Sequence, residues 1–433
     1  MGGRRHSVEL QRSTPVPMKF QSVRTLLVLG TLALAGTLHA QVVELRATIN
    51  GAQENPATTS PATGSAIMLY DVATNTYDLV VTVRNLANTI SNSHIHEGAV
   101  GVNGGVVSGL GAEAVYTRNG ETVTATFHNL TYGGDKTKLL QGGAYYNLHT
   151  PQVPSGEVRG QLIAQPKRLF ANIDVAQELA GMAAGSTINS NAKGAAIVTY
   201  DPGTNKVTVR VNLYNFNNTL RDSHFHAAPA GTAGGVVTGI GGAANYTSHG
   251  DGFYTGTFEK TFEGDPVKLL TGGTYLNFHS NVYLPGEIRG QVWPSEEMPS
   301  SRFVNLSSRG FVGTGEQVLI QGFHVTGPEP VRVAVTGKGP SLTPFGVAQA
   351  LSDPTVSVYD SAGRRIAWND DFTAPAAGSE LATIPGLPTG AKEAGLILVL
   401  PPGTYSAIVS GTGGATGVAL VEITDLRGYE PVR

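Results

Sequence analysis

The sequence of 433 residues contains no cysteine. Disulfides therefore cannot stabilise the fold, and no thiolate is available to bind a metal ion. Any transition-metal site in this chain must use imidazole nitrogens and oxygen ligands.

Charged residues are also scarce, at 14% of the chain, and the 29 basic residues do not outnumber the 32 acidic ones. Binding to nucleic acid needs a basic surface, so we expect no nucleic-acid partner. Glycine is abundant instead, with 56 residues. Many glycines and few charges favour an all-β fold with many turns over a helical one.

The N-terminal segment resembles a secretory signal. Lys19 and Arg24 precede an apolar run at residues 26–35, and Ala40 offers a cleavage point before Gln41. The run is too short to be a good membrane span, although a retained membrane anchor is the alternative. We therefore predict a signal peptide in residues 1–40 and no membrane span after its cleavage. The mature chain would be secreted, periplasmic or on the cell surface, as in an exported bacterial protein.

The rest of the chain divides into three segments. Residues 42–165 and 168–296 repeat one another at an offset of 130 residues over most of their length, whereas residues 300–433 differ. A unit this long is a duplicated globular domain and not a solenoid repeat. Proline-containing stretches at 165–167 and 293–299 are predicted linkers.

Both repeats have the pattern of β-strands. Val207, Val209 and Val211 alternate with polar residues, which is the period of a half-buried strand, and residues 76–86 are similar. Turn-forming residues at 71–75 separate consecutive strands. Since neither repeat has a convincing amphipathic helix, we predict two Greek-key barrel or sandwich domains in tandem.

Six of the 11 histidines belong to the repeated pattern. Two of them are separated by one residue in each repeat, so in a strand they share a face, while Ile95 between the first pair can enter the core. A third histidine from a neighbouring strand can complete a metal site, and three imidazoles without thiolate suit copper best, with zinc as the alternative. The alternative interpretation is that duplication copied three surface or packing histidines. The candidate metal ligands are His94, His96 and His149 in the first repeat, and His224, His226 and His279 in the second.

A carboxylate and a guanidinium follow each triad, namely Glu157 and Arg159, and Glu287 and Arg289. The two residues of each pair share a strand face. They are either a charged pair near the metal, in which Arg attracts an anion or Glu accepts a ring N–H, or a local ion pair of little energetic value. The sequence leaves both interpretations open.

The motifs resemble those of the CHRD domain, which is named for chordin and is widespread in exported bacterial proteins. The resemblance rests on Ser-His-Ile-His-Glu-Gly at 93–98, Gly-Gly-Val-Val at 104–107, Tyr-Asn-Leu-His at 146–149 and Pro-Ser-Gly-Glu-Val-Arg-Gly-Gln-Leu at 154–162. It covers both repeats and implies an all-β domain. The growth-factor context of chordin does not transfer to this chain.

A more distant resemblance is to copper/zinc superoxide dismutase, a Greek-key barrel with a His-x-His strand, a later copper-binding histidine and an arginine near the end. His94, His96, His149 and Arg159 occur here in that order. The bridging histidine, the zinc loop and the cysteine pair of that family have no counterpart. The resemblance therefore implies a copper-only or vestigial site.

The stretches at 305–315, 337–342 and 353–360 carry a further resemblance. Through them, residues 300–433 resemble a C-terminal β-sandwich module of secreted bacterial proteins, which implies adhesion, spacing or partner contact. Residues 360–363 are predicted to form a turn between two strands. Asp370 and Asp371 could offer oxygen ligands to calcium, but a solvated polar loop is the favoured interpretation.

Three functions remain open. The favoured one is an exported, non-enzymatic protein that binds one copper-like ion in each repeat and acts in metal handling or in interaction with an extracellular or cell-surface partner. The second is a copper-dependent redox enzyme similar to superoxide dismutase, and the third is a purely structural or adhesive protein. The sequence has no hydrolase nucleophile signature and no dinucleotide-binding fingerprint to support another enzyme class.

Overall fold

The computed structural model describes residues 41–295, 305–371 and 390–426. The predicted signal peptide lies outside these residues, as does part of the predicted second linker. Among the described residues no helix has the length and apolar character needed to cross a membrane. The described chain folds into antiparallel sheets, so the all-β prediction is confirmed.

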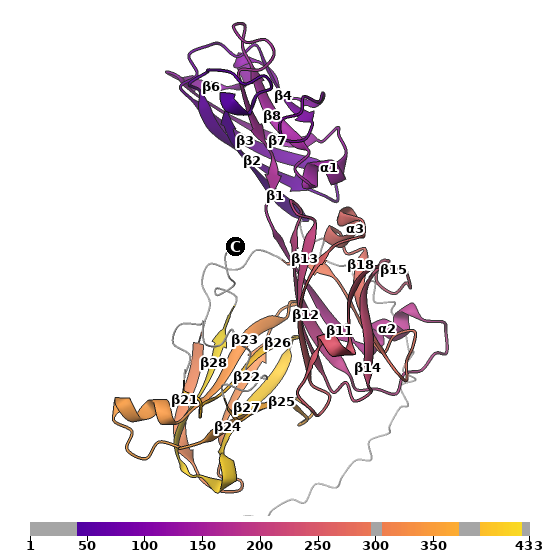
Figure 1. Cartoon of the computed structure of the whole chain (residues 1–433), viewed down its shortest axis with the longest axis vertical. Helices are drawn as coiled ribbons and strands as arrows, with labels where there is room; N and C mark the ends of the chain where they lie inside the picture. Colours follow the sequence, from indigo (N-terminus) through magenta and orange to yellow (C-terminus); the bar gives the residue numbers. More distant parts are fainter. Residues whose placement is uncertain (1–40, 296–304, 372–389, 427–433) are drawn as a thin grey trace, which may run out of the picture. The chain divides into compact units, whose positions relative to one another are not determined.

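The first repeat forms one curled sheet (Figure 1). Its strands are β1 (Val42–Asn50), β2 (Thr63–Asp71), β3 (Thr76–Arg84), β4 (Asn92–Glu97), β5 (Gly105–Gly109), β6 (Thr117–Asn119), β7 (Thr122–Thr131), β8 (Ala144–His149), β9 (Val158–Gln161) and β10 (Ile163–Ala164). Their order is β5-β4-β8-β9-β1-β2-β3-β7-β6, with β10 beside β1. A short helix, α1 (Lys136–Leu140), precedes β8.

The second repeat has the same architecture. Its elements are β11 (Lys167–Asp174), α2 (Val175–Gly181), β12 (Lys193–Asp201), β13 (Lys206–Tyr214), β14 (Leu220–Ala227), β15 (Gly235–Gly242), β16 (Thr247–Ser248), β17 (Tyr254–Thr261), α3 (Pro266–Leu270), β18 (Thr274–Ser280), β19 (Ile288–Gln291) and β20 (Trp293–Pro294). The strand order, β15-β14-β18-β19-β11-β12-β13-β17-β16, matches that of the first repeat strand by strand. The prediction of two barrel-like domains in tandem is thus confirmed.

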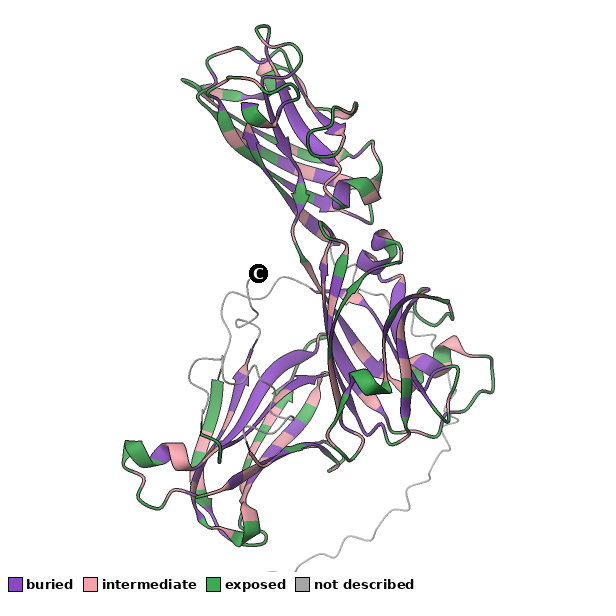
Figure 2. Cartoon of the chain, in the orientation of Figure 1, coloured by how far each residue is buried: buried purple, intermediate pink, exposed green. Residues whose placement is uncertain are grey.

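Alternation of side chains produces these sheets. In β3, Tyr77, Leu79 and Val81 are at most 1% exposed, and the residues between them are less buried. Their side chains therefore fill the inside of the curl. Figure 2 shows buried and more exposed residues alternating along the strands. The predicted turn between β2 and β3 also forms, because Asp71 Oδ1 accepts hydrogen bonds from two backbone N–H groups and Asn75 adopts a left-handed φ of 61°.

The C-terminal module consists of two four-stranded sheets, β21-β28-β23-β26 and β22-β27-β24-β25, which share a hydrophobic core. The predicted β-sandwich is confirmed. Its strands are β21 (Asn305–Val312), β22 (Leu319–Val325), β23 (Val331–Lys338), β24 (Pro354–Asp360), β25 (Arg365–Asn369), β26 (Ala394–Leu400), β27 (Gly403–Gly411) and β28 (Gly417–Asp425).

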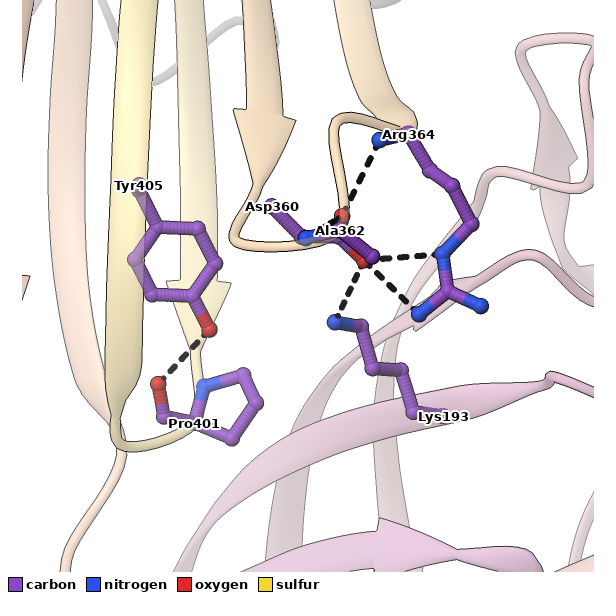
Figure 3. Close-up of polar contacts among 6 residues, drawn as sticks. All are labelled: Lys193, Asp360, Ala362, Arg364, Pro401 and Tyr405. Carbon is purple, nitrogen blue, oxygen red and sulfur yellow. Dashed lines mark hydrogen bonds and ion pairs between the residues drawn. The ribbon is translucent and has the colours of Figure 1, made fainter.

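Asp360 organises the turn between β24 and β25 (Figure 3). Its Oδ1 accepts hydrogen bonds from the backbone N–H groups of Ala362 and Arg364, at 2.9 and 3.0 Å. Its Oδ2 accepts from Arg364 Nε at 3.1 Å and from Lys193 Nζ at 2.9 Å. The turn predicted at residues 360–363 is therefore present, held by a nearly buried carboxylate.

Candidate metal centre

The three histidines of the first repeat lie on one face of two neighbouring strands. His94 and His96 project from β4 on the same side, while Ile95 between them is fully buried in the core. His149 is the last residue of β8, which pairs with β4 so that Asn92 lies opposite His149. The structure thus brings together the three side chains that the spacing singled out.

The imidazole nitrogens converge. The ring centre of His94 lies 5.1 Å from that of His149 and 5.4 Å from that of His96. One nitrogen from each ring can be chosen so that all three lie within 4.8 Å of one another. Nitrogens bound tetrahedrally to one ion, with bonds of about 2.0 Å, lie about 3.3 Å apart. Small side-chain rotations would close the difference.

Backbone carbonyl groups determine which ring nitrogen of His96 and His149 is available to bind a metal ion. His96 Nδ1 lies 2.9 Å from the carbonyl oxygen of Gly104, and His149 Nδ1 lies 3.0 Å from that of Pro154. Since a carbonyl only accepts hydrogen bonds, each Nδ1 carries the proton and each Nε2 keeps its lone pair. Within the described residues, these two Nε2 atoms and His94 Nδ1 are buried without a hydrogen-bond partner. Three buried, unpartnered nitrogens facing one another suit a cation.

Gly104 can place its carbonyl beside His96 only because it lacks a side chain. A Cβ at this position would lie 1.7 Å from the carbonyl oxygen of Glu97. Gly104 therefore has a steric role in the geometry of the site.

The second repeat reproduces this arrangement. His226 Nδ1 and His279 Nδ1 each lie 2.9 Å from a carbonyl oxygen, those of Gly234 and Leu284. His224 Nδ1 lies 3.3 Å from His279 Nε2, which is the separation expected for two nitrogens on one tetrahedral ion. The ring centres are 5.1 to 6.0 Å apart.

Burial and neighbouring rings favour the neutral form of four of the six histidines. Burial lowers the pKa of His94, His96, His226 and His279 below the usual value of 6.5, and neighbouring imidazoles lower it further. A metal binds only the neutral imidazole. These four rings are therefore ready to bind a metal at neutral pH.

A stack of three side chains supports the site from the next strand. The Tyr145 ring on β8 stacks on His96 with 5.0 Å between ring centres, and the Arg159 guanidinium carbon lies 3.4 Å from the Tyr145 ring centre. Arg159 also donates to the carbonyl oxygens of Ala99 and Val102. It therefore ties the loop that carries Gly104 to the sheet. In the second repeat Tyr275 and Arg289 take these roles.

The carboxylates two residues before the arginines, Glu157 and Glu287, do not pair with them. Glu157 accepts hydrogen bonds from the side chains of Ser60, Asn88 and Thr150, and no ion pair joins it to Arg159 among the described residues. Glu287 is bound in the same way by Ser190 and Asn218. Both carboxylates are at most 3% exposed and fasten loops to the sheet edge.

A second carboxyl group lies under the same loops. Glu54 is 7% exposed, and burial raises its pKa to about 7, although Arg159 and a hydrogen bond from Asn147 act in the opposite direction. Its Oε1 and Asn147 Oδ1 are both buried without a partner among the described residues. Two adjacent acceptors of this kind favour a protonated Glu54. Glu178 is its counterpart, and its pKa is also raised by burial.

The sequence interpretation missed several of these residues. Tyr145 and Asn147 recur 130 residues later, so the repeat itself carried the signal. Glu54 was visible in the Ala-Gln-Glu triplet that opens both repeats. Neither signal indicated a role before the strand pairing was known.

The C-terminal module contains an acidic cluster. Asp353 joins the predicted Asp370 and Asp371, with carboxylate oxygens within 4.8 Å of one another. Lys392 Nζ lies 3.2 Å from Asp353 and 3.4 Å from Asp371, and Thr412 donates to Asp370. The Lys392 ammonium group therefore neutralises part of the charge of this cluster. The favoured interpretation, a solvated polar loop, stays a prediction.

Comparison with known proteins identifies the repeats. No curated protein matches the chain. Two solved structures show weak likenesses to this chain. That of infectious bursal disease virus Gt strain has 10% identity and a TM-score of 0.14 over 81% of this chain and 72% of that one. The structure of the Faustovirus major capsid protein has 8% identity and a TM-score of 0.14, and the match covers 89% of this chain and 84% of that one. Neither likeness carries an argument.

The sequence profile of the CHRD domain matches residues 45–162 and 173–292, which together make up more than half of the chain. The resemblance to superoxide dismutase stays a prediction, because the matched profile is that of the CHRD domain. The chain belongs to the CHRD domain family and carries two copies of the domain in tandem.

Proposed function

We propose that each CHRD domain binds one copper-like metal ion through its three histidines, with zinc as the alternative ion. One observation carries the proposal: in each repeat the three rings converge, with one nitrogen of each within 4.8 Å of the others, and backbone carbonyls hold the Nδ1 protons of two rings away from the centre. Three neutral nitrogens and no thiolate suit Cu(II) and Zn(II) among the common ions.

Three protein ligands leave a coordination position for water or another ligand. The ion would then remain exchangeable or accessible to a partner, which fits metal handling or interaction outside the cell. The apolar run and small residue in 1–40 support export. N-terminal sequencing of the exported protein should give a start at Gln41.

Metal stoichiometry tests the proposal. Metal-free protein titrated with Cu(II) and, separately, with Zn(II) should bind two ions per chain. The variant His96→Ala or His226→Ala should bind one, and the double variant none. His128→Ala is the matched control, since its ring is exposed on the outside of the first repeat, and should leave two ions bound.

Two outcomes would count against metal binding. If the double variant bound as much metal as the wild type, the histidines would not be the ligands. If a folded wild type bound no ion, the purely structural interpretation would replace the proposal. Circular dichroism of each variant establishes that the β-fold is retained.

A further inference from the structure

The two metal centres differ at one position next to the ligands. Asp222 in the second repeat corresponds to Asn92 in the first, at the 130-residue offset. Both residues lie two positions before the first histidine of the pair and pair across the sheet with the third histidine. The histidines are identical in number and spacing, and the second and third of each triad share the same hydrogen-bond pattern at their Nδ1 atoms.

The two side chains are anchored in the same way. Asp222 Oδ1 accepts a hydrogen bond from the backbone N–H of Ser223 at 2.9 Å, and Asn92 Oδ1 accepts from that of Ser93 at 2.9 Å. The second terminal atom of each side chain takes no part in this anchor. In the second repeat that atom is a carboxylate oxygen, and it lies 3.2 Å from His224 Nε2.

In the first repeat the second atom is the amide Nδ2 of Asn92, which only donates hydrogen bonds. No hydrogen bond joins Asn92 to His94 in the part of the chain that the structure describes. The structure therefore provides an acceptor for the outer ring nitrogen in the second repeat, whereas the corresponding side-chain atom of Asn92 in the first repeat is a donor.

This difference bears directly on metal binding. The first histidine of each pair turns its Nδ1 toward the other two rings, so when Nδ1 binds an ion its Nε2 must carry a proton. A carboxylate that accepts this N–H fixes the tautomer and the ring orientation and makes the ligand more basic. Asp222 can do this for His224, whereas Asn92 cannot do it for His94, because its Oδ1 already accepts from Ser93 and its Nδ2 only donates.

The spacing of the ring nitrogens and the charge of Asp222 also favour tighter metal binding in the second repeat. His224 Nδ1 and His279 Nε2 are already 3.3 Å apart, whereas the corresponding atoms of the first repeat have no such contact. The charge of Asp222 also attracts a cation. Arg221 beside it has the opposite charge, but it is exposed, so water and salt screen its effect.

We propose that the two centres are unequal: Asp222 is a positioning residue that makes the second CHRD domain a tight, retaining metal site, while the first domain binds the same ion more weakly and exchanges it. This inference rests on the proposed metal-binding function. The contribution of such a carboxylate predicts an affinity difference of about 10- to 100-fold.

Single-site variants of the full chain test it. His226→Ala leaves the first site and His96→Ala leaves the second, and each is titrated with Cu(II) against a chromophoric chelator. The second site should bind about 10- to 100-fold more tightly. Adding Asp222→Asn to the His96→Ala variant should abolish this advantage, and adding Asn92→Asp to the His226→Ala variant should strengthen the first site. Glu263→Gln, which removes an exposed carboxylate from the second repeat, is the charge control and should change neither affinity.

The reciprocal exchange protects the test from misfolding, because a gain of affinity in Asn92→Asp cannot come from damage to the fold. Equal affinities that neither exchange alters would overturn the inference while leaving the proposed function intact. A wild type that binds no ion would overturn both. An equal loss in Asp222→Asn and Glu263→Gln would show that only overall charge matters, and would also overturn the positioning role.

Discussion

The guanidinium carbon of Arg159 lies 3.4 Å from the ring centre of Tyr145, and that ring stacks on His96. Arg159, Tyr145 and His96 come from the adjacent strands β9, β8 and β4, so the stack crosses the sheet beneath one proposed metal ligand. Cation–π contact and stacking restrict the His96 ring from the side that faces away from solvent. The buried Arg159 side chain thus both anchors the loop that carries Gly104 and helps to orient the His96 ring.

Arg159→Lys should therefore destabilise the first repeat by about 3 kcal/mol, because lysine cannot reproduce the hydrogen bonds to both loop carbonyls or the planar contact with the ring. Metal affinity of the first site should fall with it, since Gly104 belongs to the loop that Arg159 holds. Urea denaturation and metal titration measure the two effects. Arg84→Lys, at an exposed strand end, is the control and should change neither quantity. Unchanged metal affinity in Arg159→Lys would mean that the loop held by Arg159 does not affect metal binding.

Glu54 makes the stability of the first repeat depend on pH. Its pKa is raised by burial from 4.5 to about 7, so the folded state holds a proton that the unfolded chain releases. The stabilisation is complete below pH 4.5 and is lost as the pH rises through about 7. Glu54→Gln keeps a neutral side chain at every pH. It should therefore be more stable than the wild type at about pH 8, by up to about 3 kcal/mol, and similar to it at low pH.

Urea denaturation at several pH values measures this difference. Glu121→Gln, at an exposed carboxylate, should follow the wild-type curve. Parallel curves for the wild type and Glu54→Gln would mean that Glu54 titrates normally and that its buried environment opens in solution.

Strand period and repeat spacing were sufficient to predict the histidine centre. His94 and His96 share a face because they are two residues apart in a strand, and the 130-residue offset selected His149 as the third member. The all-β fold and the sandwich followed from the same alternation and from the turn residues. These signals are local or repeated, so a single sequence displays them.

The supporting residues could not be predicted, because their partners are distant in the chain. Glu54 meets Asn147 across 93 residues, and Glu157 meets Ser60 across 97. The spacing of Glu157 and Arg159 suggested a pair, but loops supply separate partners for each side chain. The role of Asp222 emerged only when the structure showed which nitrogen of His224 faces away from the site.

Gly156 is required by crowding as well as by its backbone conformation. Its φ is +127°, and a Cβ would lie 2.7 Å from both Glu54 Oε1 and Asn147 Oδ1. Gly156→Ala should destabilise the first repeat by about 3 kcal/mol or more, because it adds steric overlap to backbone strain. Gly120→Ala, with a φ of +60° and no atom within 4 Å of its Cβ, should cost only about 1 kcal/mol. Thermal denaturation compares the two variants. Equal losses of stability would mean that Glu54 and Asn147 move to make room for the extra methyl group.

Metal binding should stabilise the folded chain, because the histidines converge only after the strands have paired. An ion at about 100 times its dissociation constant adds about 2.7 kcal/mol to the free energy of unfolding of the domain that binds it. Cu(II) or Zn(II) should therefore raise the melting temperature of the metal-free wild type by several degrees, and a chelator should reverse the rise. The double variant of His96→Ala and His226→Ala should show no rise. Ca2+, which prefers oxygen ligands, is the control ion and should leave the CHRD domains unaffected. A rise of the same size in the double variant would place the stabilising ion away from the histidines.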